Sequence, residues 1–438
     1  MESTQPIYRH FSFTSFNHLF PHNFIKQTWL NMKPYRRKRY LGLDGFLWLG
    51  LFTAAHTYLP NLQQIFNLAC RLPQTMAPVS FVSVSAFCQY RNGFPIKILV
   101  SVWRYLTQRL YQLYPSETIR WKGLRLLAID GTILNLLESL WPHFGALKGC
   151  RGAGPAQAYL ITLYDLITRI PIAFRVGKAE NNSRPQPLFK RIVKHLKPDD
   201  LVMIDSGFYS IEIFALLLKR GVNFIIPMRA GGKPKLIRRI SKNDGLYQIK
   251  ASRQWKNVSY VPEVMTVRII NVQHTGFRPK RLVTSLLNAS SYSSEEIAWL
   301  YHQRWHIETF FREFKHTLQA TRWHARSPHA FYTEIFFQMF LVIITRLIMA
   351  EAALKSGEPI GQLSFGKCLA EIRYILSIIT HLPVKYWAKV YEELLIRLSG
   401  YRIDVRPGRR FERDTQKRRE QSRSRYSYII KKEKKDVA

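Results

Sequence analysis

Acidic residues and cysteines are both scarce in this chain of 438 residues. Its 29 Asp and Glu stand against 66 Lys and Arg, which gives a formal net charge of +37 and a pI near 10.3. An excess of this size indicates a polyanionic partner, although ribosomal, chromatin and membrane-surface proteins share it. The four cysteines, Cys70, Cys88, Cys150 and Cys368, form no Cys-x-x-Cys pair. They argue against a disulfide framework or a zinc site and favour free thiols in a reducing cytoplasm.

The chain also lacks a long apolar run without charges. Residues 46–59 are apolar but too few to span a bilayer, and the longer run at 335–354 contains Arg346 and Glu351. We therefore expect a buried core helix at 335–354 and no membrane association. The N-terminus has no basic-then-apolar signal pattern. A hydrophobic content of 47% excludes global disorder, and the length predicts more than one domain.

Residues 301–315, with the sequence YHQRWHIETFFREFK, are the most informative stretch. On one continuous α-helix, five of their side chains fall within roughly 80° of one another: Tyr301, Arg304, Glu308, Arg312 and Lys315. An adjoining apolar stripe has the same period and consists of Leu300, Ile307, Phe311, Phe314 and Leu318. The pattern predicts a helix packed on one side, with a row of cations and a phenol around a single carboxylate. By itself, such a Glu is consistent with a plain ion pair.

Two upstream segments each end an apolar run with Asp. The first runs from Leu124 to Asp130 and continues Gly-Thr, and the second runs from Asp200 to Asp205 and continues Ser-Gly-Phe. Both patterns are typical of buried strands that deliver an Asp near their ends, with a glycine that lets backbone or ligand come close. A charge placed there is costly unless it is paired or binds a cation. Together with Glu308, the two Asp residues make a three-carboxylate set suited to Mg²⁺ or Mn²⁺.

These motifs resemble the DDE transposases, and more specifically the fourth insertion-sequence family, which is marked by Tyr-x2-Arg-x3-Glu-x6-Lys. Tyr301, Arg304, Glu308 and Lys315 meet every spacing of that signature. The family's Asp-Gly-Thr after the first strand is matched at 130–132, and its Asp-x-Gly-Phe at 205–208. The resemblance covers about residues 120 to 350 and shows no departure at the three acidic positions.

The resemblance implies an α/β fold, with a ribonuclease H-like catalytic core, a β-rich insertion and a helical N-terminal domain. It implies an enzyme that cuts DNA at terminal inverted repeats and joins the freed 3′-hydroxyl ends to target DNA. Asp130, Asp205 and Glu308 would bind two Mg²⁺ ions, for which Mn²⁺ could substitute. Tyr301, Arg304 and Lys315 would grip the transposon end, and Arg312, one turn beyond Glu308, would join them. We therefore expect double-stranded DNA as the partner and a homodimer in the synaptic complex. We also expect the protein to act on the bacterial or archaeal nucleoid in the cytoplasm.

The coarse organisation predicts five regions. Residues 1–120 read as a helical DNA-binding domain, with a basic cluster at 35–40 and helices at 62–72 and 96–113. Residues 121–228 form the first part of the ribonuclease H-like core, in the order three strands, helix, strand, helix, strand. Residues 229–281 are the β-rich insertion. Residues 282–350 complete the core, with a capping box at Ser293 and Glu296, and residues 351–438 form a helical region with a basic tail.

Several alternatives remain at the level of sequence. A different ribonuclease H-like nuclease or resolvase, or a DNA-binding protein that kept the scaffold, would share parts of the pattern. His302 and His306 have a spacing that can bind zinc, but no His-Glu-x-x-His or nearby cysteine supports it. Glu180 is a further loop acid, best read as an exposed charge. Asp165 is read as structural and Glu313 as a surface charge.

Overall fold

The structure is a computed structural model, and the following account concerns the part of the chain it describes. That part comprises residues 43–59, 61–70, 83–146, 155–179, 186–229, 234–251, 255, 258–273, 279–359, 361–378, 382 and 384–403. Residues Met1–Tyr401 form one compact unit and Arg402–Ala438 a second. The basic cluster at 35–40, Cys150, Glu180 and the basic tail after residue 403 lie outside the described residues.

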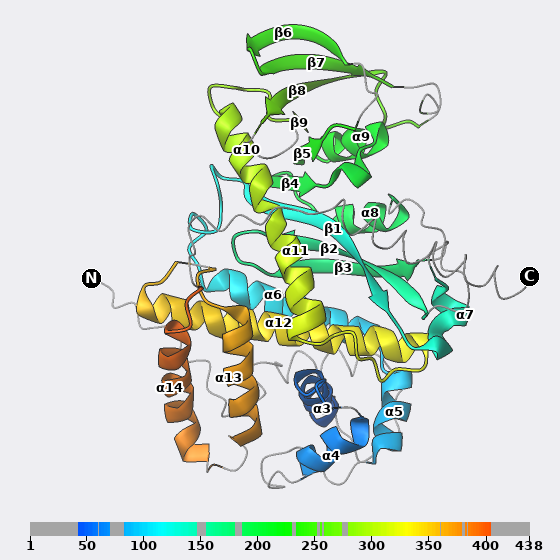
Figure 1. The fold of residues 1–438 in the computed structure, drawn as a ribbon, viewed down its shortest axis with the longest axis vertical. Coiled ribbons are helices and arrows are strands. Elements are labelled where there is room, and N and C mark those ends of the chain that lie inside the picture. The colour runs from blue at the N-terminus through cyan, green and yellow to red at the C-terminus, as the bar shows by residue number, and fades with distance from the viewer. Residues whose placement is uncertain are drawn as a thin grey trace, which may run out of the picture. The chain divides into compact units, whose positions relative to one another are not determined.

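A nine-stranded sheet in the order β3-β2-β1-β4-β5-β9-β8-β7-β6 organises the first unit (Figure 1). Its first part consists of β1 (Arg125–Asn135), β2 (Gln157–Asp165), β3 (Pro171–Lys178), β4 (Asp200–Ile204) and β5 (Asn223–Pro227). β1 pairs antiparallel with β2 and parallel with β4, and β4 pairs parallel with β5. The order of strands and helices predicted between residues 124 and 227 is confirmed, except that the short helix α7 (Trp141–Phe144), which was not predicted, lies between β1 and β2. β1 and β4 are neighbours, as the ribonuclease H-like fold requires.

The insertion continues the same sheet. Its strands are β6 (Lys235–Ser241), β7 (Asp244–Lys250) and β8 (Val264–Val272), and β9 (Lys280–Thr284) joins them antiparallel to β5. β6 was not anticipated from the sequence, because all but one of its residues are exposed and no inward-facing apolar pattern marks it.

Helices cover the two faces of the sheet and form two cores. On one face, α8 (Gln186–Ile192) and α9 (Ile211–Lys219) cover an apolar cluster that includes Leu127, Ile129 and Val202. On the other face lie the N-terminal helices, the signature segment and the C-terminal helices. These are α3 (Leu43–Ala55), α4 (Leu62–Cys70), α5 (Val84–Gly93), α6 (Ile96–Gln112), α7 (Trp141–Phe144), α10 (Ser294–Gln303), α11 (Trp305–Arg312), α12 (Pro328–Ser356), α13 (Phe365–Ile378) and α14 (Trp387–Ser399).

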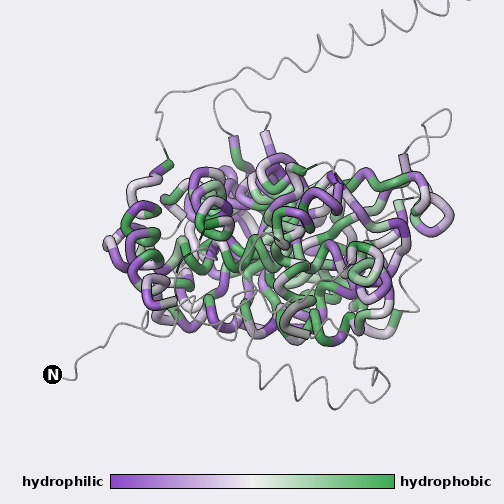
Figure 2. Tube along the Cα trace, turned by 90° about the horizontal axis from the view of Figure 1, so that it is seen from below, coloured by the Kyte–Doolittle hydropathy of each residue, from purple (hydrophilic) through white to green (hydrophobic). Residues whose placement is uncertain are grey.

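The long helix α12 is the centre of the second core. It packs against α3, α5, α6, α13 and α14. It is long and apolar enough to cross a membrane by composition, but its apolar window is entirely buried inside the protein, which confirms the predicted core helix at 335–354. Pro328 is the first residue of this helix, and Ser327 is its N-cap. In the hydropathy-coloured trace, hydrophobic residues run through the interior (Figure 2).

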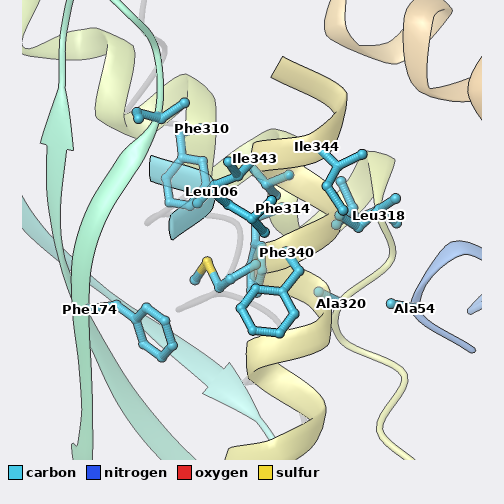
Figure 3. Close-up of a cluster of buried hydrophobic side chains, with 14 of the residues drawn as sticks. Ala54, Leu106, Phe174, Phe310, Phe314, Leu318, Ala320, Phe340, Ile343 and Ile344 are labelled. Atoms are coloured by element: carbon cyan, nitrogen blue, oxygen red, sulfur yellow. The ribbon is translucent and has the colours of Figure 1, made fainter. Parts of the chain in front are cut away.

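The signature segment packs apolar side chains onto α12, two of which, Phe314 and Leu318, belong to the predicted stripe. Phe310, Phe314 and Leu318 approach Phe340, Ile343 and Ile344 of α12, with Leu106 of α6 beside them (Figure 3). The capping box at Ser293 and Glu296 is present and starts α10. The single continuous helix predicted over 301–315 is wrong, however. The helix is interrupted at Arg304, where Arg304 N and Ile307 N bond carbonyls three residues back, and residues Glu313–Thr317 form a π-helical turn.

Candidate active site at the carboxyl ends of β1 and β4

Asp130 and Asp205 are brought together by the parallel pairing of β1 and β4. The last pair between these strands is Ile129 with Ile204, so each Asp is the next residue along the chain after that pair. Asp205 caps the short helix Ser206–Phe208 by accepting a hydrogen bond from Gly207 N. Asp130 lies inside β1, which runs on to Asn135 beyond its pairing with β4. Beyond Ile129, the edge of β1 that faces β4 is therefore not paired with any described strand of the sheet.

The Arg304 guanidinium lies close to all three predicted carboxylates. Its Nη1 donates to Asp130 Oδ2 at 2.9 Å, and its Nη2 donates to Glu308 Oε1 at 2.9 Å. The same Nη2 lies 3.9 Å from Asp205 Oδ1. The Arg304 side chain is only 6% exposed, whereas the side chains of Asp130, Asp205 and Glu308 are 20, 43 and 36% exposed. One buried cation thus holds together three acids that come from two strands and a helix.

The electrostatics of the cluster are dominated by burial of Asp130. Burial raises the pKa of this carboxyl to about 6, and the charges of Asp205 and Glu308 also raise it. Arg304 and the N–H of Gly131, which donates to Asp130 Oδ1 at 2.7 Å, act in the opposite direction. Burial lowers the pKa of Arg304, but Tyr301 and the three carboxylates outweigh it, so the net shift is upward. A second cation near Asp130 would favour its charged form further.

The remaining signature residues divide into two groups. Tyr301 is buried, and its ring lies 5.7 Å from the Arg304 guanidinium and 5.8 Å from Lys280 Nζ; burial raises the pKa of its hydroxyl to about 12. Arg312 is exposed and bonds Thr309. Lys315 is half-buried inside the π-turn, and burial lowers its pKa. The structure therefore brings Tyr301 and Arg304 to the carboxylates, while Arg312 and Lys315 lie further along the segment.

Two features near the site escaped the sequence analysis. Glu313 is not a surface charge, because it pairs at 2.5 Å with the buried Arg346 of α12. Tyr159 of β2 lies over Gly131, the residue that follows Asp130. The register of the β1–β2 pair determines that contact, and no local pattern reveals it. Asp165 is structural as predicted, since it is buried and accepts hydrogen bonds from Tyr111 Oη and two backbone N–H groups.

The donor set is suited to a hard divalent cation. The carboxylates supply only oxygen, and their shared neighbour is itself a cation, so the fold tolerates positive charge at their centre. Arg304 lies among the carboxylates in this structure. In this arrangement, the described residues contain no group of three Asp, Glu, His or Cys side chains that is close enough to hold one metal ion. His306 bonds Gln303, and burial lowers its pKa to about 3.

Comparison of the sequence with known families establishes the family of this chain. The family described as "Transposase DDE domain" matches residues 121–344, which include β1, β4 and the signature segment. The chain belongs to the DDE transposases. Among curated proteins it is 26% identical over 356 residues to the transposase InsG for insertion sequence element IS4 of Escherichia coli, covering 78% of each chain. This similarity supports the assignment of the chain to the fourth insertion-sequence family.

Further relatives are transposases as well. The transposase for insertion sequence element IS231C of Bacillus thuringiensis is 22% identical, over 66% of this chain and 70% of its own length. Among solved structures, the piggyBac transposase synaptic complex with hairpin DNA aligns over 88% of this chain and 83% of that chain at 12% identity. Its TM-score of 0.39 is too low to establish a common fold.

Family membership settles the general activity of this transposase. It is an enzyme that cuts DNA and transfers strands in transposition, and it depends on divalent metal ions. DNA is its partner.

Proposed function

We propose that Asp130, Asp205 and Glu308 are the catalytic carboxylates of this transposase and hold two Mg²⁺ ions, for which Mn²⁺ can substitute. The observation that carries the proposal is the meeting of these three side chains at one guanidinium, although Arg304 lies 174 positions from Asp130 in the chain. Held there, divalent cations supply the charge that activates a hydroxyl nucleophile and stabilises the leaving oxygen.

The chain's own residues supply position and charge. Asp130 is held by Gly131 N–H, and Glu308 by its helix, so both carboxylates keep fixed places at the edge of the sheet. Arg304 keeps the acids together until DNA and cations arrive, and then turns to the DNA phosphates. Tyr301, Arg312 and Lys315 contact the transposon end beside it, since Arg and Lys bind phosphate and Tyr stacks or donates a hydrogen bond.

Two reactions at this site free the element's 3′ end and join it to target DNA. In the first, water attacks the phosphorus at the end of the element and the P–O3′ bond breaks, which leaves a 3′-hydroxyl on the element and a 5′-phosphate on the flank. In the second, that 3′-hydroxyl attacks a target phosphodiester, and the target's 3′-oxygen leaves. Both displacements need the same groups, so a single set of carboxylates serves both.

The wider assignments complete the proposal. The substrate ends are terminal inverted repeats, and two copies of the chain bring two ends together as a homodimer. Residues 1–120 contribute site-specific DNA binding, 229–281 are the insertion, 121–228 and 282–350 form the catalytic core, and 351–438 carry the C-terminal helices and tail. The transposase works on the nucleoid in the cytoplasm.

Cleavage of a labelled duplex that carries the element's own end tests the site. The end is identified from inverted repeats that flank the coding region. We expect nicking with Mg²⁺ or Mn²⁺ by the wild type, and no nicking by Glu308→Gln although the variant still binds the duplex. Glu393→Gln, an exposed substitution on α14, is the control and should cut normally. Equal cutting by Glu308→Gln would remove Glu308 from the site.

A further inference from the structure

Tyr159 lies directly against the backbone that follows Asp130. In the antiparallel pair of β1 and β2, Tyr159 is opposite Ile133, which makes Gly131 its diagonal neighbour on the same face. A Cβ atom added to Gly131 would lie 2.0 Å from the Tyr159 hydroxyl oxygen and 2.2 Å from its Cζ. The end of the phenol therefore occupies the space that any side chain at position 131 would need.

The hydroxyl keeps its hydrogen-bonding capacity. Among the described residues, no hydrogen bond engages the Tyr159 hydroxyl, and the side chain is partly exposed. Burial raises the pKa of this hydroxyl, and the charges of Asp130 and Asp205 raise it further. The group is therefore a protonated donor at neutral pH, close enough to both acids to interact with their charges.

Asp130 stands where the open edge of β1 begins, and the Tyr159 ring reaches Gly131 from β2, which pairs with the opposite edge of β1. β1 continues beyond its last pair with β4, so the edge from Asp130 onward is not covered by that neighbour. Residues 130 and 131 alternate in direction along the strand, which places the Asp130 carboxylate on one face of β1 and the Tyr159 hydroxyl on the other. A phosphate that approaches this edge meets the carboxylate from one side and the phenol from the other.

We propose that the Tyr159 hydroxyl donates a hydrogen bond to a non-bridging oxygen of the DNA phosphate at which the chain is cut, and so holds that phosphate against Asp130. A neutral donor suits this place, because it attracts the phosphate without forming an ion pair with the carboxylates, as a cation such as Arg304 does. The proposal rests on the proposed function of Asp130, Asp205 and Glu308. It adds a substrate-contacting residue that lies outside the signature motifs.

Tyr159→Phe isolates the hydroxyl, because the ring still fills the space over Gly131. We expect single-turnover nicking to fall about 10- to 100-fold, the range for a lost hydrogen bond to a charged group, while duplex affinity without metal and the melting temperature stay near wild type. Tyr164→Phe is the matched control. It removes a hydroxyl from the same strand, but Tyr164 is fully buried and stacked on Phe310, so no DNA contact is lost.

A phosphorothioate at the cut position separates a contact from a structural effect. Sulfur in place of the correct non-bridging oxygen weakens the hydrogen bond. We therefore expect one diastereomer to slow the wild type more than it slows Tyr159→Phe, whereas Tyr164→Phe should match the wild type.

Three results would overturn the proposal, and each is distinct. Nicking by Tyr159→Phe within twofold of wild type would show that the hydroxyl is not used. If Tyr159→Phe is slower but each diastereomer slows it as much as it slows the wild type, Tyr159 acts only through the fold. In either case, loss of nicking in Asp130→Asn would leave the proposed function standing. Failure of the wild type to nick a verified end with either metal would overturn both proposals.

Discussion

Arg304 and Asp130 form a nearly buried ion pair, with Nη1 and Oδ2 2.9 Å apart, at the point where the unpaired edge of β1 begins. The guanidinium also serves Glu308 and Asp205, so one cation offsets the repulsion among three acids. Under the proposed function, the same position is where the divalent cations bind. Removing Arg304 should therefore make the fold depend more on added cations.

Arg304→Gln should lower stability without metal by about 1–3 kcal/mol, less than for a fully buried pair because the carboxylates are partly exposed. Millimolar Mn²⁺ should recover part of that loss, because the cation then stabilises the native carboxylates. Thermal melts with EDTA and with Mn²⁺ measure both effects. Arg312→Gln, at an exposed position of the same segment, should show neither. An equal Mn²⁺ shift in Arg304→Gln and wild type would contradict the prediction.

Gly131→Ala should be destabilising because of the 2.0 Å approach to the Tyr159 hydroxyl. Overpacking of this kind costs about 1–3 kcal/mol. Tyr159→Leu in the same chain should restore part of the stability, since it vacates the space. Denaturant unfolding of the two single variants and the double variant gives the coupling energy. Additive effects would show that the two side chains do not compete for the same space.

Stability should depend on pH through Glu351 of α12. Burial raises the pKa of this carboxyl to about 7 from its usual 4.5, and it accepts a hydrogen bond from Tyr391. A raised acid favours folding when protonated, so its stabilising contribution is complete below pH 4.5 and is lost as pH rises to 7. The interval corresponds to roughly 3 kcal/mol.

Glu351→Gln mimics the protonated form at every pH. Relative to wild type, its unfolding free energy should be similar at pH 4.5 and higher by up to about 3 kcal/mol at pH 8. Chemical denaturation at a series of pH values measures the difference. The exposed Glu393→Gln on α14 should give a difference that does not change with pH. A constant difference for Glu351→Gln would refute the assignment.

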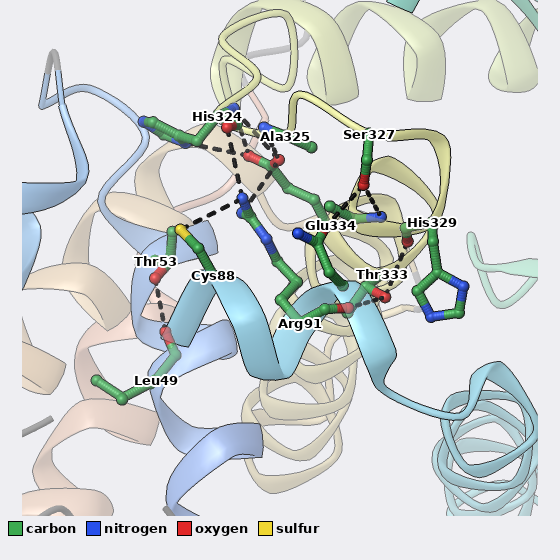
Figure 4. Close-up of polar contacts among 12 residues, drawn as sticks. Leu49, Thr53, Cys88, Arg91, His324, Ala325, Ser327, His329, Thr333 and Glu334 are labelled. Carbon is green, nitrogen blue, oxygen red and sulfur yellow. Dashed lines mark hydrogen bonds and ion pairs between the residues drawn. The ribbon is translucent and has the colours of Figure 1, made fainter. Parts of the chain in front are cut away.

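The buried pair of Arg91 and Glu334 ties α5 to α12 (Figure 4). Glu334 also accepts hydrogen bonds from the backbone N–H groups of His324 and Ala325. Arg91→Met should cost about 1.5–3 kcal/mol, because the buried carboxylate loses its guanidinium partner but keeps three donors, including His324 Nδ1. Glu263→Gln breaks the exposed Lys250–Glu263 pair and should change stability by under about 0.5 kcal/mol. Similar losses in the two variants would contradict this account.

The sequence predicted the strands that carry the acids because their burial leaves an apolar run. Leu201–Ile204 and the strand before Asp130 are buried on both faces, and each run stops at a carboxylate. The adjacency of the two strands came from family resemblance, because pairing between distant segments leaves no local pattern. The exposed β6 shows the converse, since a strand without a buried face gives no periodic signal.

The signature segment shows where periodicity fails. The spacing of 3.6 residues per turn placed five side chains in one row, but Arg304 is held by acids from other elements and Glu313 by Arg346. These tertiary contacts accompany the interruption at Arg304 and the π-turn, and both change the phase of the helix. The ion pair between Asp130 and Arg304 joins residues 174 positions apart, and no local sequence pattern predicts such a pair.

The central place of α12 has a consequence for synthesis on the ribosome. The helices α3, α5 and α6 bury their apolar faces against a segment that ends at Ser356, roughly 240 residues after α6. At ~5–20 residues per second, this interval is about 12–50 s, during which those faces lack their partner. These N-terminal helices are therefore exposed to aggregation for that interval, while the rest of the chain is being synthesised.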